Sequence, residues 1–230
     1  MKDVLDKSFD SEFDKIENLT WYPWVGKDYK KGTRRILVVG DSHYSVDCEG
    51  YFDQECYDDF MSTKEASRNI LERYLNGETW NFYRNLESTF PDSDNFWSEI
   101  TFYNFIQQPM RQSNAIPNEQ EYITAWHCFV DLIKILKPTD CIFIGVRSET
   151  CFGYSCQKMG IKCTIEDMPI KINRTHPRKG NIVLSEAYAL DLYFIHHTSQ
   201  YYSPDQWNEF LKQQLPEAMK WLILNKNNCC

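Results

Sequence analysis

The stretch Arg35-Ile-Leu-Val-Val-Gly-Asp-Ser-His-Tyr44 decides the fold of this 230-residue chain. Its apolar run, Ile36 to Val39, stops at Gly40 and is followed at once by polar side chains. Short strands that are apolar throughout are typical of a parallel sheet covered on both faces. In such sheets the residues just beyond the carboxyl ends of the strands build the ligand site. The stretch therefore predicts a buried strand that delivers Asp41 and its neighbours to a site.

Three more segments extend this pattern along the chain. Two of them are apolar runs that stop at polar residues, and the third is a helix end, a proline and a buried strand closing on glycine. They are Phe102-Tyr-Asn-Phe-Ile106, Tyr193-Phe-Ile-His-His-Thr-Ser199 and Leu136-Lys-Pro-Thr-Asp-Cys-Ile-Phe-Ile-Gly145. Because carboxyl ends of parallel strands share one sheet edge, we expect their polar residues to converge on one concave site.

Helices are expected between these strands. Pro117-Asn118 with Glu121 opens a helix that Pro138 ends, and Ser62-Thr-Lys-Glu65 reads as a capping box before a second helix. Ser203, with Pro204 after it, opens the last helix. Further expected elements are a polar loop over 41–61, helices over 79–88 and 148–159, and edge elements at Ile161–Ile165 and Ile182–Leu184.

Alternating strands and helices predict an α/β fold. We expect a three-layer α/β/α sandwich with a mainly parallel central sheet of about four strands. No repeat, low-complexity tract or Pro/Gly-rich linker marks a boundary, so residues 1–230 are expected to form a single domain, with 1–30 an N-terminal extension packed on it.

The composition limits the class of protein. With 42% hydrophobic and 15% aromatic residues, the chain can build a sizeable core. No apolar run reaches the roughly 18 residues of a membrane span, and the charged start has no signal-peptide core. The nine cysteines include no Cys-x-x-Cys pair, which suits free thiols in a reducing compartment. We therefore expect a cytoplasmic monomer without a membrane partner.

Charge is unevenly distributed around a net value of −8, which disfavours non-specific binding to nucleic acid. Basic residues gather in segments 27–35 and 171–179, whereas segment 47–59 carries six carboxylates and no basic residue. Because this acidic segment closely follows Asp41, it is expected to repel a polyanion that approaches the site.

Gly40-Asp41-Ser42-His43 allows one reading as the nucleophile block of a GDSL-type serine esterase. A serine nucleophile needs a histidine base that is itself oriented by an acid. Such enzymes usually supply both from a late Asp-x-x-His, and no aspartate here lies three residues before any of the five histidines. Asp191 precedes His196 by five residues.

The second reading includes the rest of the chain. Five short motifs, taken in order, resemble the uracil-DNA glycosylase superfamily. They are Val39-Gly-Asp-Ser42, Thr101–Glu121, Leu136-Lys-Pro138, Ile142-Phe-Ile-Gly145 and His197-Thr-Ser199. In that superfamily a strand ends on Asn, a loop with Pro and Arg precedes a helix, and Leu-x-Pro leads into a strand closing on Gly. The resemblance spans roughly residues 35–215, with identity confined to these short motifs.

The resemblance implies a role for each matching position. Asp41 would activate water, His197 would donate to a base carbonyl as charge develops there, and Asn104 would read the edge of a flipped base. The other residues implied in base binding are Tyr51, Phe52 and Tyr44. Those implied in loop or phosphate contacts are Gly40, Ser42, His43 and Ser199.

Each of these residues also has a purely structural interpretation. Asn104 can simply tie down its own loop, and Asp41 can cap backbone amides. His197 can be a satisfied core histidine, with His196 competing for its place in the pocket. Tyr51 and Phe52 can simply pack.

The chain departs from the family pattern at several positions. His43 and Thr198 stand where the family usually has proline, and Gln108 stands near the position of a cysteine in the iron–sulfur branch. No Cys-x-x-Cys pair precedes the first strand, so no cluster and no other cofactor is expected. The carboxylates of segment 47–59 fit no EF-hand spacing, so no metal is expected.

The sequence thus favours a base-recognising hydrolase that cleaves an N-glycosidic bond of a damaged or deaminated base with an activated water. Its expected partner is DNA or a nucleobase-containing small molecule. A non-catalytic module that binds a nucleobase, nucleotide or protein through the same pocket is the alternative, and the serine esterase is a third.

Overall fold

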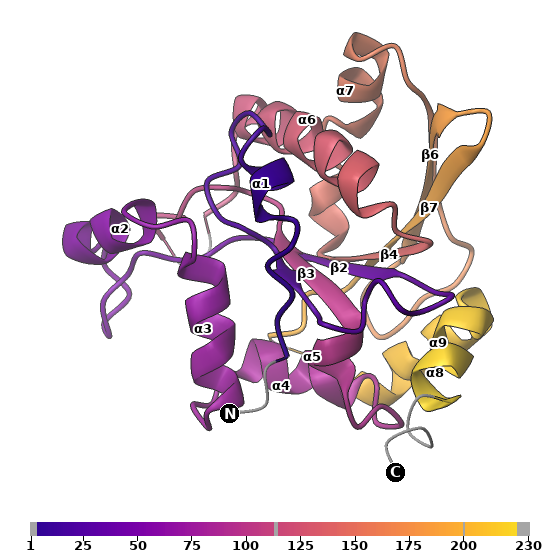
Figure 1. Cartoon of the computed structure of the whole chain (residues 1–230), viewed down its shortest axis with the longest axis horizontal. Coiled ribbons are helices and arrows are strands. Elements are labelled where there is room, and N and C mark those ends of the chain that lie inside the picture. The colour runs from indigo at the N-terminus through magenta and orange to yellow at the C-terminus, as the bar shows by residue number, and fades with distance from the viewer. Residues whose placement is uncertain (1–3, 113–114, 200, 225–230) are drawn as a thin grey trace.

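The fold is built on a seven-stranded mixed sheet with helices around it (Figure 1). This computed structural model describes residues 4–112, 115–199 and 201–224. The strands are β1 (Trp24–Val25), β2 (Ile36–Gly40), β3 (Ile100–Asn104), β4 (Asp140–Ile144), β5 (Lys162–Asp167), β6 (Arg178–Ser185) and β7 (Tyr188–Ile195).

The strand order is β1-β3-β2-β4-β7-β6-β5. β3, β2, β4 and β7 are adjacent and parallel, and they carry the four segments that the sequence singled out. The expected parallel sheet of about four strands therefore corresponds to the centre of a larger mixed sheet. β1 pairs antiparallel with β3, and β7, β6 and β5 form an antiparallel meander. Of the two elements expected at an edge, β5 is an edge strand, whereas β6, which contains Ile182–Leu184, lies inside the sheet.

The two faces of the sheet carry two hydrophobic clusters. Alternation along β2 sends Leu37 and Val39 into one cluster and Ile36 and Val38 into the other. The first cluster includes residues of α1 (Asp10–Phe13), α6 (Glu119–Leu136) and α7 (Phe152–Lys158). The second includes residues of α3 (Ala66–Leu75), α4 (Asn81–Ser88), α5 (Phe96–Glu99), α8 (Pro204–Gln214) and α9 (Pro216–Leu224).

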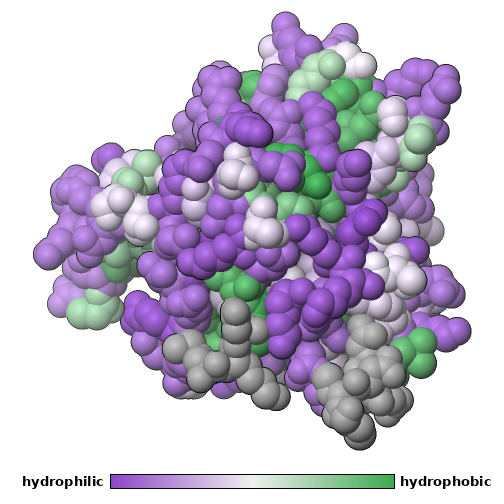
Figure 2. All heavy atoms as spheres, viewed as in Figure 1, coloured by the Kyte–Doolittle hydropathy of each residue, from purple (hydrophilic) through white to green (hydrophobic). Residues whose placement is uncertain are grey.

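The surface agrees with this arrangement. On the face shown in Figure 2, hydrophilic residues predominate and hydrophobic residues form small groups. No helix in residues 4–112, 115–199 and 201–224 is long and apolar enough to cross a membrane.

Helix boundaries follow local chemistry in most places. The expected capping box of α6 is present, because the Asn118 side chain accepts from the Glu121 N–H and Glu121 accepts from the Asn118 N–H. Lys137 takes a left-handed conformation (φ 47°) before Pro138 ends the helix. Ser203 is the N-cap residue of α8 with Pro204 inside the first turn, although its side chain makes no cap hydrogen bond to the described residues.

Two local expectations were wrong. Segment 41–61 is not only a loop, because it ends in α2 (Gln54–Met61), which Asp53 caps by accepting from the Cys56 N–H. The capping box expected at Ser62 does not form, because Ser62 ends α2 instead and donates its hydroxyl to the Asp59 carbonyl. The α3 helix therefore begins after Glu65 without a side-chain cap.

The N-terminal segment contributes both to the sheet and to the core. It supplies β1 and buries Phe13 and Trp21. Arg68 of α3, whose side chain is fully buried, reaches across to it and donates to both carboxylate oxygens of Asp10 and to the Pro23 carbonyl. This arginine therefore links α3 to α1 and to the residue that precedes β1.

We predict that Arg68→Ala lowers the free energy of unfolding by about 3 kcal/mol, because it leaves a partly buried carboxylate and a backbone carbonyl without their hydrogen-bond donor. Urea denaturation measures the change, and Arg84→Ala, an exposed arginine bonded only to Asn81 among the described residues, serves as the control. Equal unfolding midpoints for both variants would show that the Arg68 contacts contribute no stability.

Candidate active site

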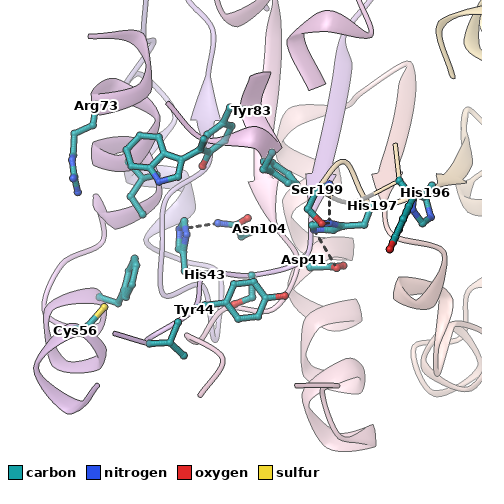
Figure 3. A pocket seen from close by; sticks show the side chains of 17 residues that line it. Asp41, His43, Tyr44, Cys56, Arg73, Tyr83, Asn104, His196, His197 and Ser199 are labelled. Carbon is teal, nitrogen blue, oxygen red and sulfur yellow. Dashed lines mark hydrogen bonds and ion pairs between the residues drawn. The ribbon is translucent and has the colours of Figure 1, made fainter. Parts of the chain in front are cut away.

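A cavity of about 950 Å³ opens at the carboxyl edge of the parallel strands (Figure 3). Asp41 follows β2, Asn104 ends β3, and His196 and His197 follow β7, and all four line it. Their convergence follows from the register, which sets Gly40 opposite Asn104 on the neighbouring strand. The three polar groups that the sequence singled out thus share one concave site.

The cavity walls are mostly apolar and aromatic. Tyr44 and Val46 come from the loop after β2, Tyr201 comes from the segment before α8, and the remaining apolar lining comes from α2, α3, α4 and the turn before α4. These further residues are Phe60, Ile70, Trp80, Phe82 and Tyr83. An apolar cleft with few convergent polar groups is the usual form of a small-molecule site.

Asp41 is held by the turn that follows β4. Ser148, in the 3-10 helix η1 (Val146–Glu149), donates its hydroxyl to Asp41 Oδ1 at 3.1 Å. Gly145 leaves room for this carboxylate, since a Cβ there would lie 2.7 Å from Oδ1, and its φ of 139° favours glycine. Burial raises the pKa of Asp41, against the opposing effects of His197, Ser148 and Arg147. A carboxylate in this state is a stronger base than a solvated one.

His197 faces Asp41, with its Nε2 3.8 Å from Asp41 Oδ2. The Ser199 backbone N–H donates to His197 Nδ1 at 3.3 Å, so the neutral ring carries its hydrogen on Nε2. Burial lowers the pKa of His197, which favours this neutral form, although Asp41 acts in the opposite direction. The side chains keep 29% (His197) and 38% (Asp41) of their surface exposed, so the gap between them is open to the cavity.

Asn104 belongs to a buried polar cluster beneath the cavity. Its amide nitrogen lies 2.8 Å from His43 Nε2 and donates to Ser67 Oγ at 3.2 Å, and His43 and Ser67 also bond to each other. Its amide oxygen lies over Gly40, where an added Cβ would be 3.1 Å away. Figure 3 shows the nitrogen turned toward His43 and the oxygen turned away from it.

Thr198 and His43 are both held in place by contacts with other segments. Thr198 is fully buried, its hydroxyl donates to the Phe82 carbonyl, and its own carbonyl accepts from Asn85 of α4. The His43 ring stacks on Phe60 with ring centres 4.8 Å apart and meets Trp21 edge-on. Hydrogen bonds and ring packing therefore hold the two loops that carry His43 and Thr198.

Of the histidine pair, both members line the cavity, but only His197 faces Asp41. His196 Nδ1 lies 2.9 Å from the Thr175 hydroxyl, on the side of β6. Ser199 also lines the cavity, with its hydroxyl 2.8 Å from His197 Nδ1. Ser42 lines it too, but its hydroxyl donates to the Gln108 carbonyl rather than to a histidine.

Tyr51 and Phe52, expected to stack on a base, do not line the cavity. Tyr51 is 68% exposed, and Phe52 packs against Tyr57 and the Arg111 guanidinium. Asp47 explains this placement, because its carboxylate accepts from the Tyr51 backbone N–H and closes a turn that points outward. The aromatic walls are supplied instead by residues from helices distant in sequence. The sequence predicted a helix after Ser62–Glu65 and another over 79–88, but nothing in it indicated that their side chains would line this cavity.

The two basic segments lie at different edges of the sheet. Segment 27–35 runs into the start of β2, where Arg34 pairs with Asp140 at the amino end of β4. It is therefore on the edge opposite the cavity. Segment 171–179 lies near the cavity edge, but Arg178 pairs with Glu149 and Asp167 there, and Lys179 pairs with Asp191.

The acidic segment 47–59 stands beside the cavity mouth. It leads into α2, which projects from the body of the fold and contributes Cys56 and Phe60 to the cavity lining (Figure 1). Two of its carboxylates, Asp47 and Asp53, accept from backbone N–H groups and so have local structural roles. The others, Glu49, Glu55, Asp58 and Asp59, are exposed.

No group of three or more histidine, cysteine, aspartate or glutamate side chains among the described residues is arranged to hold a metal ion. The chain matches no protein-family model, no curated protein and no solved structure.

The buried His43 predicts a pH dependence of stability. Burial lowers the pKa of His43 from 6.5 to about 3. Below pH 6.5 the His43 side chain of the unfolded chain binds a proton, whereas that of the folded chain stays neutral down to about pH 3. The free energy of unfolding therefore decreases as the pH falls from 6.5 to 3, by up to about 1.4 kcal/mol per pH unit.

We predict that His43→Gln flattens this acid limb. Urea denaturation at pH 6.5 and 4.5 should show a loss about 2 kcal/mol smaller for the variant than for the parent chain. His127→Gln, on the exposed face of α6, should leave the loss unchanged. The same acid-induced loss in all three chains would mean that His43 is not held neutral.

Proposed function

We propose that this chain is a base-recognising hydrolase that cleaves an N-glycosidic bond with an activated water. The scaffold we propose is a three-layer α/β/α fold of the uracil-DNA glycosylase type. The observation that carries the proposal is the pairing of Asp41 and His197 across a 3.8 Å gap in the cavity that Asn104 also lines. A base, a water and a sugar carbon are what such a set of groups can hold together.

At 3.8 Å, Asp41 Oδ2 and His197 Nε2 make no direct hydrogen bond, so each can bond to a water or ligand atom that lies beside the pair in the cavity. In the proposed reaction the carbon–nitrogen bond to the base breaks, and its electron pair leaves with the base. The water oxygen bonds to the sugar carbon, and Asp41, whose pKa burial raises, takes the water proton.

His197 suits the leaving-group side of this reaction. Its Nδ1 already accepts from the Ser199 N–H, so Nε2 presents its hydrogen to the cavity. A neutral imidazole donor placed in a desolvated site can stabilise the negative charge that develops on a base carbonyl oxygen. Asn104 and the aromatic walls supply an edge contact and stacking surfaces for the base.

A non-catalytic module that binds a nucleobase, nucleotide or protein through the same cavity is the second candidate, and the exposed carboxylates of segment 47–59 beside the cavity favour it. The Asn104 amide limits base recognition in this candidate as it does in the hydrolase. Bidentate reading of a pyrimidine edge needs both a donor and an acceptor from this side chain. Its nitrogen is already engaged by His43 and Ser67, which leaves the oxygen for a ligand. Binding without turnover would identify this class.

The serine esterase has the weakest support. A nucleophilic Ser42 would need a histidine within hydrogen-bond distance, but its hydroxyl donates to the Gln108 carbonyl. Ester hydrolysis that disappears in Ser42→Ala would nevertheless establish it.

Release of free base from uracil-containing single-stranded oligonucleotides, double-stranded oligonucleotides and nucleotides, followed by chromatography, tests the hydrolase. We predict that Asp41→Asn lowers the rate by roughly 10²-fold or more while leaving binding nearly unchanged, because proton transfer to the carboxylate occurs only in the transition state. Release from the double-stranded oligonucleotide would add a role in DNA repair.

Asp131→Asn, an exposed aspartate of α6, is the matched control and should keep full activity. Activity that survives Asp41→Asn would remove Asp41 from the mechanism. Tight binding of a nucleobase compound with no release of base by the parent chain would favour the non-catalytic module instead.

A further inference from the structure

A second cavity of about 270 Å³ adjoins the large one. The two share a wall made of Asp41, Ser42, Tyr44, His197 and Ser199. The smaller cavity is further lined by apolar residues of 105–110 and 115–117, by Tyr122 of α6 and by Arg147 of η1. A ligand that fills both cavities must therefore pass the Asp41–His197 pair.

Arg147 is the cation of this second cavity, and its side chain is exposed. The chain has nine arginines, all among the described residues. The guanidinium groups of the other eight each contact a described carboxylate, backbone carbonyl, amide or aromatic ring, whereas that of Arg147 has no such partner.

The backbone that carries Arg147 is nevertheless well anchored. Ser148 is buried and donates to Asp41, and Glu149 pairs with Arg178 of β6. The Thr150 carbonyl accepts from the Trp126 indole at 2.9 Å. An unpaired guanidinium on a fixed turn, inside a cavity, is suited to a planar or tetrahedral anion, because its fork of donors is already placed.

The amino end of α6 also lies beside this cavity, through Pro117 and Tyr122. It is not a free donor, because its capping box already satisfies the Glu121 N–H, and Glu119 and Glu121 put negative charge in the first turn. Arg147 is therefore the group that would bind an anion there, and it also offsets the charge of the neighbouring Asp41.

We propose that Arg147 and the second cavity bind the 5′-phosphate of a mononucleotide whose base occupies the large cavity. This inference rests on the proposed function, because the base and the Asp41–His197 pair fix where the sugar lies. It names the substrate class as a phosphorylated nucleoside rather than a bare nucleoside or a nucleic-acid chain.

Three features favour a mononucleotide over a polymer. The basic segment 27–35 lies at the opposite sheet edge, and Arg178 and Lys179 of segment 171–179 are paired with carboxylates. The exposed carboxylates of segment 47–59 stand beside the cavity mouth, where a second phosphate group would be repelled. The small volume of the second cavity suits one phosphate and part of a sugar.

Isothermal titration of the full chain tests this, with the deoxynucleosides and 5′-monophosphates of uracil, thymine, cytosine, adenine and guanine as ligands. A single-stranded oligonucleotide containing deoxyuridine is the polymer probe, at 150 mM salt, with chromatography to check for released base. For the preferred base we expect the monophosphate to bind about 10-fold or more tightly than the nucleoside, the range of one or two charge-assisted hydrogen bonds.

Arg147→Ala should reduce this ratio to within about 2-fold while the nucleoside affinity stays unchanged, and Arg147→Lys should keep part of it. Arg84→Ala, an exposed arginine of α4, is the matched control and should keep the full ratio. The advantage of the monophosphate should also shrink as salt rises.

Equal affinities of nucleoside and monophosphate, or a ratio that survives Arg147→Ala, would overturn the phosphate site while leaving the base cavity in place. An oligonucleotide that binds more tightly than any monophosphate would overturn the mononucleotide and point to a nucleic-acid chain. Binding of none of these probes would overturn base recognition itself, and the phosphate site with it.

Discussion

The structure depends on the double parallel pairing of β2, which hydrogen-bonds to β3 on one side and to β4 on the other. A strand in this position is buried on both faces and along both edges, so every side chain from Ile36 to Val39 must be apolar. Polar side chains can therefore follow only after Gly40, where Asp41 lies at the edge of the sheet. Gly40 itself must lack a side chain, because a Cβ would lie 2.9 Å from Phe102 and 3.1 Å from the Asn104 amide oxygen.

The loops at this edge are stiffened by polar and aromatic contacts instead of by proline. Thr198 fastens the His197 loop to α4 through two hydrogen bonds, and His43 anchors the Asp41 loop through ring packing and a bond to Ser67. Such anchors act at a distance from the backbone they fix, so they also couple the loops to other groups. Because His43 Nε2 bonds to the amide nitrogen of Asn104, the amide oxygen is the atom left for the cavity. A proline would stiffen the loop without that influence.

Charge is divided between the two edges of the sheet. At the amino edge Arg34 neutralises the buried Asp140, so much of the positive charge in segment 27–35 serves the fold. At the carboxyl edge the carboxylates of segment 47–59 lie beside the entrance to a mostly apolar cavity, and Arg147 stands unpaired near Asp41. An anionic ligand would therefore be attracted at one point of the site rather than along a track, which limits the size of the anion that can be held there.

The sequence by itself determined the elements whose signals are local. The apolar runs of β2, β3, β4 and β7 and the capping box of α6 follow from burial and from backbone donors that need acceptors nearby. It also determined that Asp41, Asn104 and His197 share an edge, because parallel strands leave no other choice. Only tertiary structure decided that Phe60 and Phe82, rather than Tyr51 and Phe52, wall the cavity, that Ser62 ends α2 instead of opening α3, and that Arg147 stays unpaired. These outcomes depend on which distant surfaces meet, and contacts between residues far apart in the chain leave no periodic trace in the sequence.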